Sequence, residues 1–94
     1  QYLAPDERAL APIIHRTLRR MREESLAGVP RAKVEASAER ALREAGFDPD
    51  YAVLRRPDFS EPQDADGGPL VALVAARLGR TRLIDNLEFE RPGV

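Results

Sequence analysis

Residues 71–86 read VALVAARLGRTRLIDN, and this stretch decides the fold. Residues 70–76 are all apolar, Gly79 lies in a three-residue connection, and residues 81–90 alternate between apolar and polar. An apolar run, a glycine and an alternating run predict a β-hairpin.

A first helix is predicted upstream of the hairpin. Its apolar positions recur at intervals of three and four: Leu10, Ile13, Ile14, Leu18 and Met21. Pro5 suits the first turn, and Asp6 and Glu7 favour the positive end of the helix dipole. Pro12 removes a backbone donor and clashes with the preceding turn. We therefore expect a kink or a split at Pro12, with a short turn before it and the main helix over residues 13–26.

A second helix is predicted between Pro30 and Gly46, with a narrower apolar stripe of Val34, Ala38, Ala41, Leu42 and Ala45. Beyond it, residues 51–54 predict a short strand, and the polar residues 58–69 predict a surface loop. The order helix, helix, strand, strand, strand predicts one α+β domain over residues 1–94. Its architecture is a two-layer sandwich, with two helices packed on a three-stranded antiparallel sheet.

Both faces of the strand at residues 70–76 are apolar. Leu70, Ala72, Val74 and Ala76 alternate with Val71, Leu73 and Ala75. Helices can cover one face only, and a strand that is exposed on its other side normally carries polar residues there. We expect the second face to meet another domain, a second copy of the chain, or the long loop.

The composition limits the possible partners and compartment. The 15 basic and 16 acidic residues give a formal net charge of -1, which provides little attraction for nucleic acid or anionic lipid. The sequence has no cysteine, no apolar run long enough to span a bilayer, and no signal-peptide pattern. We expect a cytoplasmic protein that binds neither nucleic acid nor a membrane.

Three groups of residues could carry chemistry, and each has a simpler interpretation. His15 could be a base or a metal ligand, but it is the only histidine and no cysteine can join it, so we interpret it as a helix-surface residue. The run Gly67-Gly68-Pro69 precedes a strand rather than a helix, so a turn explains it better than a phosphate loop. The pair Asp85 and Asn86 lacks a partner acid or base, and we expect Asp85 to hydrogen-bond Thr81, an arginine or loop backbone.

Two charged clusters also have a structural and a functional interpretation. One is on the first helix and comprises Arg16, Arg19, Arg20 and Arg22, followed by Glu23 and Glu24. The spacing favours ion pairs of Arg19 with Glu23 and of Arg20 with Glu24 over an anion or RNA patch. The other is in the loop and comprises Glu61, Asp64 and Asp66. It lacks the ligand pattern of an EF-hand, so a solvated loop is favoured over a calcium site.

Residues 71–86 resemble the near-terminal hairpin of pantothenate synthetases, in which a strand ending in Ala-Ala-Arg leads through a glycine turn to Arg-Leu-Ile-Asp-Asn. The opening QYLAPDERALAP is similar to the Tyr-Leu-x-Pro-Glu-x-Arg run of that family and its later Ala-Pro. Asp50 and Tyr51 resemble the Asp-Tyr that starts the family's first C-terminal strand. The resemblance covers the whole chain.

The resemblance implies a C-terminal lid domain, hinged to a Rossmann-like N-terminal domain that handles ATP and Mg²⁺. The intact enzyme joins pantoate to β-alanine through a pantoyl adenylate, and closure of the lid would protect that adenylate from water. The family's paired histidines and its Ser-Ser-Arg-Asn linker match no position here. We therefore expect a piece of a longer protein that is inactive alone, with no catalytic, cofactor-binding or metal-binding residue of its own.

The resemblance assigns positions rather than chemistry to this chain. Gln1, Tyr2 and Leu3 would lie next to the hinge, since the family's linker directly precedes the Tyr-Leu position. The arginines of the hairpin, Arg77, Arg80 and Arg82, could approach phosphates when the lid closes, although a solvent-exposed turn is the simpler interpretation. The expected partner is the N-terminal domain, and a homodimer could form through the uncovered sheet face. The alternative function is a stand-alone interaction or dimerisation module.

Overall fold

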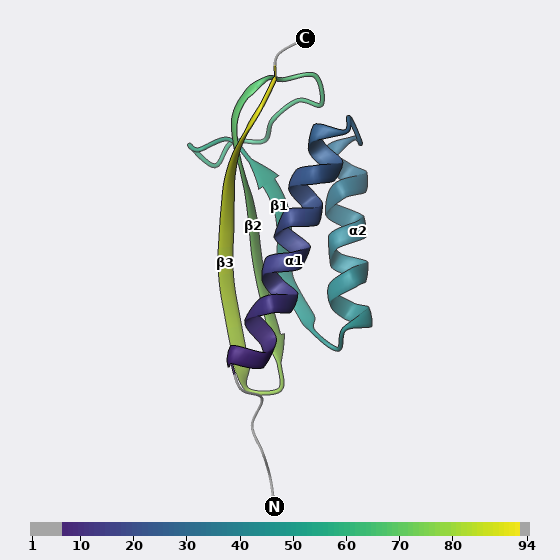
Figure 1. Ribbon diagram of the computed structural model, residues 1–94, viewed down its shortest axis with the longest axis vertical. Helices are drawn as coiled ribbons and strands as arrows, with labels where there is room; N and C mark the ends of the chain where they lie inside the picture. The colour runs from purple at the N-terminus through teal and green to yellow at the C-terminus, as the bar shows by residue number, and fades with distance from the viewer. Residues whose placement is uncertain (1–6, 93–94) are drawn as a thin grey trace, which may run out of the picture.

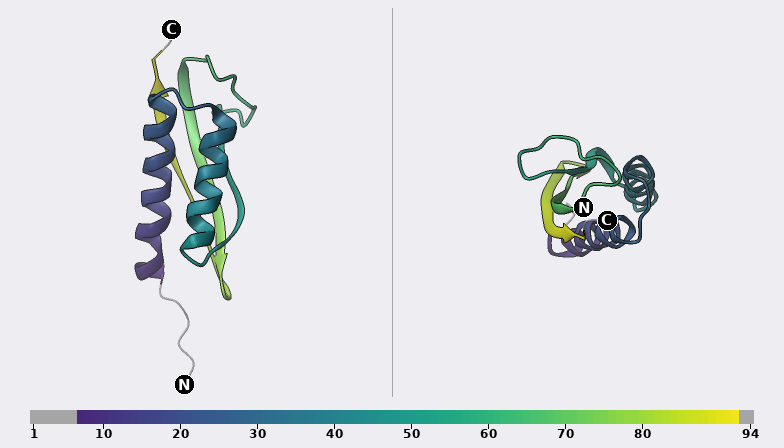
Figure 2. Two further views of the ribbon diagram at one scale, coloured as in Figure 1. Left: turned by 90° about the vertical axis from the view of Figure 1, so that its right-hand side faces the viewer. Right: turned by 90° about the horizontal axis from the view of Figure 1, so that it is seen from above.

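The computed structural model describes residues 7–92 and has the predicted order of elements (Figure 1). The helices and strands are α1 (Glu7–Leu26), α2 (Arg31–Glu44), β1 (Asp48–Arg55), β2 (Gly68–Leu78) and β3 (Thr81–Arg91). The three strands form one antiparallel sheet in the order β1-β2-β3. Both helices pack side by side on one face of this sheet (Figure 2). The predicted α+β fold with two helices on a three-stranded antiparallel sheet is confirmed.

The first helix does not split at Pro12. It runs without a break from Glu7 to Leu26, so the prediction of a separate turn before a helix at residue 13 is wrong. Proline has no N–H to donate to the carbonyl four residues earlier in the helix. Because Pro12 is exposed, water can hydrogen-bond this carbonyl instead. The flanking Leu10 and Ile14 are only 7% and 1% exposed, and their packing holds both sides of the proline in one helix. The proposed start at Pro5 and Asp6 lies outside the described residues.

The core lies between the helices and one face of the sheet. Its buried members from the helices are Leu10, Ile14, Leu18, Met21, Val34, Ala38 and Leu42, as the helical spacing predicts. Of the other predicted stripe positions, Ile13 and Ala41 are half-buried and Ala45 is exposed. The sheet contributes Ala52, Leu54, Ala72, Val74 and Ala76, each at most 1% exposed. Alanine at three of these five positions lets the helix backbones approach the strands closely. Small residues on the sheet thus face large residues on the helices, which gives the dense packing of a protein interior.

Both helices end in the same hydrogen-bonded motif. Gly46 has φ +96°, and its N–H donates to the carbonyl of Arg43 at 3.0 Å. The N–H of Phe47 donates to the carbonyl of Leu42 at 2.9 Å, which completes a Schellman motif. Gly28, with φ +91°, ends α1 in the same way. The motif at Gly46 turns the chain so that Phe47, which is 3% exposed, enters the core just before β1 begins.

The hairpin is longer and tighter than predicted. Strand β2 starts at Gly68 rather than at residue 70, and it runs to Leu78. Leu78 pairs with Thr81, so the connection is a two-residue turn of Gly79 and Arg80 instead of three residues. Gly79 has φ +61°, as expected for the first central residue of a type II′ turn, which matches the twist of the strands.

The sheet face without helices is partly covered by its own strands. Val71 and Ala75 lie on this face, yet they are only 6% and 0% exposed, because the larger side chains directly opposite them on β1, Arg55 and Tyr51, share that face. Leu73 is half-buried, and Ile84 of β3 is 59% exposed. The expectation of an uncovered apolar face therefore holds for the centre and the β3 side of this face. It does not hold for the whole length of β2.

The C-terminal motif of α2 gives a test of the fold. Gly46→Ala places a side chain at φ +96°, where an added Cβ would meet Leu78 Cδ1 at 3.5 Å. We expect a loss of about 1 kcal/mol in the free energy of unfolding, since an L-residue is strained in that region. Urea unfolding followed by circular dichroism measures it. Gly67→Ala is the matched control, because Gly67 is exposed and has no positive φ, and an equal loss in both variants would contradict this explanation.

Candidate functional site at the hairpin

A β-bulge in β1 creates a charged cluster at the hairpin end of the sheet. Pro49 pairs with Ala76 and Tyr51 pairs with Ala75, so Asp50 is an extra residue with no partner on β2. A bulge re-aims the side chain of the extra residue. Asp50 consequently lies beside two arginines of the hairpin instead of facing the helices.

Arg77 and Arg82 both bind the carboxylate of Asp50. Arg82 Nε donates to Asp50 Oδ2 at 2.8 Å, and Arg77 Nη2 lies 3.2 Å from Asp50 Oδ1. The hydrogen bond from Arg82 is the largest cause that holds the pKa of Asp50 below its ordinary value of 3.8, with a further contribution from Arg77. The two arginine side chains remain 58% and 45% exposed, so part of each guanidinium faces solvent. We call Asp50, Arg77 and Arg82 the arginine clamp.

The clamp lies at the end of the sheet where α1 begins. The β2–β3 turn and the first turn of α1 are at the same end of the molecule (Figure 1). Arg80, in the turn, is exposed and adds a third guanidinium there. Two guanidiniums oriented by one carboxylate can bind an anionic group in a fixed geometry. The cluster contains no nucleophile paired with a base, so it is suited to binding and not to covalent chemistry.

The other residues singled out in the sequence do not join this cluster. His15 is exposed on α1, which agrees with a helix-surface residue. Gly68 has φ +101° and starts β2, so the Gly67-Gly68-Pro69 run makes the turn into a strand. Asp85 accepts a hydrogen bond from the backbone N–H of Asn86 at 2.8 Å, and not from Thr81 or an arginine. Within residues 7–92 no group of three or more histidine or acidic side chains could hold a metal ion.

The arginines of α1 form one of the two expected ion pairs. Arg20 Nε lies 3.0 Å from Glu24 Oε2, as the spacing of four residues predicts. Glu23 Oε2 instead lies 3.9 Å from Arg22 Nη2, so the predicted ion pair of Glu23 with Arg19 is wrong. Arg22 is directly adjacent in sequence and its long side chain reaches back to the carboxylate.

The acidic residues of the loop hold the loop in place. Asp64 Oδ1 accepts a hydrogen bond from the backbone N–H of Arg31 at 2.8 Å, which caps the start of α2 from 33 residues away. Asp66 pairs with Arg56 and also accepts from the N–H of Gln63 at 2.9 Å. Hydrogen bonds to Gln63 and Arg56 lower the pKa of Asp66. The carboxylates that suggested a calcium site, Asp64 and Asp66, are thus already paired with Arg56 and with backbone amides of the chain.

Sequence reasoning found the hairpin arginines but missed the role of Asp50. The available signal was Pro49, because a proline inside a strand marks an edge or a bulge. The alternation of residues 51–54 gives no information about a bulge that starts before it. The positions expected next to a hinge, Gln1, Tyr2 and Leu3, lie outside the described residues.

Neither α1 nor α2 has the length and hydropathy of a membrane-crossing helix, as far as the described part of the chain shows.

Comparison with known proteins gives one consistent family. The sequence profile of pantoate-beta-alanine ligase matches residues 1–88. Proteins named pantothenate synthetase are 57% identical in Xanthomonas oryzae pv. oryzae (strain PXO99A) and 60% identical in Stenotrophomonas maltophilia (strain K279a), over 89 residues each. These matches cover 95% of this chain and 32% of each relative. The chain thus spans about a third of the length of the curated relatives it matches.

Solved structures agree with the sequence comparison. The crystal structure of pantothenate synthetase from Thermus thermophilus superposes with a TM-score of 0.72 at 36% sequence identity. The superposition covers 92% of this chain and 32% of that chain. The helices and strands of this chain therefore recur as one part of a larger enzyme.

The arginine clamp predicts the titration of Asp50. Because its pKa is lowered in the folded chain, the ion pair stabilises the fold above pH 3.8 and the stabilisation is lost as the pH falls through the lowered pKa. The carboxyl ¹³C shift of Asp50, measured by NMR against pH, should have its midpoint below 3.8. Arg82→Gln should raise this midpoint more than Arg77→Gln does, since the Arg82 hydrogen bond is the larger cause. Equal midpoints in the unmodified chain and in both variants would contradict the arginine clamp.

Proposed function

The chain belongs to the pantoate-beta-alanine ligase family, and on that basis we propose that it is the C-terminal lid domain of an enzyme that joins pantoate to β-alanine at the expense of ATP. The observation that carries the proposal is identity of 57% and 60% to proteins named pantothenate synthetase over 95% of this chain and 32% of theirs. A cytoplasmic location is part of the proposal.

The preceding domain of the longer protein supplies the reaction centre in this proposal. The described residues include no cluster for a metal ion, and the glycine run at residues 67–68 precedes a strand instead of a helix. They therefore do not fit Mg²⁺ or the phosphates of ATP as a complete site. ATP and Mg²⁺ are held by the Rossmann-like N-terminal domain, and this chain contributes the cover.

Closure of the lid protects a reactive intermediate. A pantoyl adenylate is an activated acyl group that water can attack in place of the amine of β-alanine. A domain that closes over the site excludes bulk water and leaves the bound amine as the available nucleophile. The buried, alanine-lined contact between helices and sheet makes this domain rigid enough to move as one body.

The hairpin end is the part of the lid that faces the reaction centre in this proposal. The clamp and Arg80 lie at the end where α1 begins, and the linker to the preceding domain would join at that end. Their guanidiniums would approach phosphate oxygens when the lid closes, with Asp50 as the positioning residue that fixes Arg77 and Arg82. Arginine suits this role because its fork matches the geometry of phosphate oxygens.

The complete reading frame that contains this chain tests the proposed function. With ATP, pantoate and β-alanine, the complete protein should release AMP and pantothenate in equal amounts, and the 94-residue chain alone should release neither. A protein that ends before Gln1 should release AMP in excess of pantothenate, because water intercepts the adenylate when the lid is missing. AMP production by the isolated chain, or none by the complete protein, would overturn the proposal.

The lid contacts need a separate test in the complete protein. Arg77→Ala, Arg80→Ala and Arg82→Ala are compared by their rate of adenylation, measured as pyrophosphate release in a single turnover. We expect at least one of them to lose about tenfold or more in rate, because a hydrogen bond to a charged group contributes roughly 1.5–3 kcal/mol and about 1.4 kcal/mol changes a rate tenfold. Arg43→Ala, on the outer face of α2, is the matched control and should leave the rate unchanged. Unchanged rates in all three hairpin variants would dispose of the lid contacts.

A further inference from the structure

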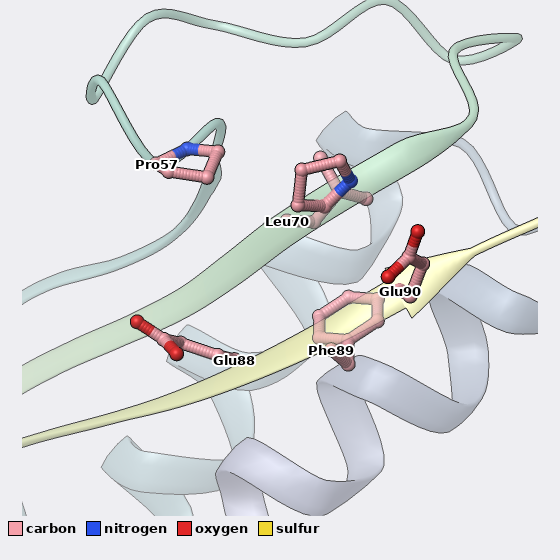
Figure 3. A pocket seen from close by; sticks show the side chains of 6 residues that line it. Pro57, Leu70, Glu88, Phe89 and Glu90 are labelled. Carbon is pink, nitrogen blue, oxygen red and sulfur yellow. The ribbon is translucent and has the colours of Figure 1, made fainter.

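A depression lies at the end of the sheet away from the hairpin, where the long loop joins β1 to β2. Its volume is about 440 Å³, which suits a short stretch of peptide or a small ligand. Figure 3 shows Pro57 of the loop on one side of β2, and Glu88 and Glu90 of β3 on the other. We call this hollow the loop-end depression, and its lining residues are Pro57, Pro69, Leu70, Glu88, Phe89 and Glu90.

The loop-end depression offers apolar surface to a partner. Pro57 and Pro69 are exposed, and Phe89 is half-buried. A hollow that combines reachable apolar side chains with a few polar groups is typical of a binding surface.

The two carboxylates of the depression are not neutralised within the described part of the chain. Glu88 and Glu90 are exposed, and neither forms an ion pair with another described residue. They are two residues apart on one strand, so they share a face of the sheet about 7 Å apart and repel each other. A cation between them would be attracted by both charges. The depression thus favours a positively charged group next to an apolar one.

The turn that contains Pro57 holds Phe59 in a strained conformation. The N–H of Phe59 donates to the carbonyl of Arg56 at 2.7 Å, and the N–H of Arg56 donates to the carbonyl of Ser60 at 2.9 Å. These two bonds define a three-residue turn closed by a G1 bulge, in which the last turn residue is left-handed and is normally glycine. Phe59 occupies that position with φ +69°.

The fold gains little from phenylalanine at this position. The residue is 68% exposed, and the left-handed region is strained for any residue with a Cβ. Other groups hold the turn, since Asp58 Oδ1 accepts hydrogen bonds from the N–H and the hydroxyl of Ser60 at 3.0 and 2.6 Å. A rigid turn thus presents an aromatic ring to solvent beside the depression. Strain that the fold does not need points to a contact with another molecule.

We propose that the loop-end depression and Phe59 bind a basic peptide segment of a partner protein, in which arginine alternates with aliphatic residues. The guanidinium of one arginine lies between Glu88 and Glu90, and a neighbouring aliphatic side chain fills the depression against Pro57. A second arginine stacks on the ring of Phe59. Arginine suits both contacts better than lysine, because its planar fork pairs with carboxylates and stacks on aromatic rings.

A peptide fits this surface better than a single small cation. Phe59 follows Pro57 in the turn on one side of β2, whereas the two carboxylates lie on the other side. One small cation cannot contact both, but an extended peptide repeats its side chains at about 3.4 Å per residue and reaches across. Nucleic acid is disfavoured, because the carboxylates would repel its phosphates.

The proposed surface is separate from the hairpin arginines of the proposed function. Strand β3 has 11 residues, so its two ends are roughly 33 Å apart. A peptide at the loop-end depression therefore leaves the hairpin end free to face the reaction centre. The two roles can fail or succeed independently.

Peptide titration tests the proposal. The probe is an acetylated and amidated hexapeptide of three Arg-Leu repeats, added to the ¹⁵N-labelled chain and followed by NMR. Exposed ion pairs and cation–π contacts are individually weak, so we expect a dissociation constant of about 1 mM. Amide shifts should be confined to residues 56–60, 68–71 and 87–91. Three Glu-Leu repeats should leave these amides unchanged, and three Arg-Gly repeats should bind at least roughly threefold more weakly, since they lack the aliphatic side chains.

Two variants separate binding from folding. Glu88→Gln with Glu90→Gln should weaken the peptide at least roughly fivefold, whereas Glu23→Gln with Glu44→Gln removes two exposed carboxylates from the helical layer and should leave binding unchanged. Phe59→Gly should weaken the peptide roughly threefold. Its urea midpoint should stay equal or rise, because glycine adopts a positive φ without strain.

Five results would overturn the proposal. They are an absence of amide shifts at about 10 mM peptide, shifts that lie on the helices, and unchanged affinity in the double glutamine variant of β3. The fourth is the same set of shifts with Ca²⁺ alone, which would mean that the carboxylates accept any cation. The fifth is a lower urea midpoint for Phe59→Gly, which would assign the ring to the stability of the loop. None of these measurements uses the enzymatic reaction, so the proposed function stands or falls separately.

Discussion

The pairing of β2 on both sides is the constraint on which the rest of the structure depends. Eleven β3 positions pair with β2 in one uninterrupted register, and β1 pairs with seven positions on its other side. The backbone of this central strand is hydrogen-bonded on both edges. Its apolar side chains lie on the two faces of the sheet, and each face must be covered. Alanine at residues 72 and 76 brings the helices close to one face, and the flanking strands screen Val71 and Ala75 on the other. A shift of one residue would exchange the two faces and remove this fit.

The bulge at Asp50 connects the register of the sheet to the candidate site. The pairing slips by one residue between Pro49 and Tyr51, and this slip puts Asp50 beside Arg77 and Arg82. The two arginines would repel each other on a regular sheet. One carboxylate between them relieves that repulsion and orients both guanidiniums, while their outer atoms stay exposed. The cluster is thus both a stabilising contact of the sheet and a prepared anion-binding surface at the end where α1 begins.

Hydrogen bonds and an ion pair tie residues 63–66 of the long loop to β3, to α2 and to Arg56. Arg91 of β3 donates to the carbonyls of Asp66 and Gln63 at 2.6 and 3.0 Å. Asp64 caps α2, and Arg56 binds Asp66. These contacts join β3, α2 and the loop at the end of the sheet opposite the hairpin. Pro57 of the loop and Glu88 and Glu90 of β3 line the same depression.

The sequence by itself determined the elements, their order and the residues of the core, because helical and strand spacing depend on local geometry. The stripe from Leu10 to Met21 and the hairpin at residues 71–86 were correct for this reason, and the same stretch identified the family. The sequence did not determine the continuity of α1 through Pro12, the bulge at Asp50 or the capping of α2 by Asp64. Each depends on a contact between residues far apart in the chain or on burial on both sides of an unfavourable residue. Only the packed sheet and helices decided these, since local propensities carry no information about which distant group will satisfy a backbone amide or a charge.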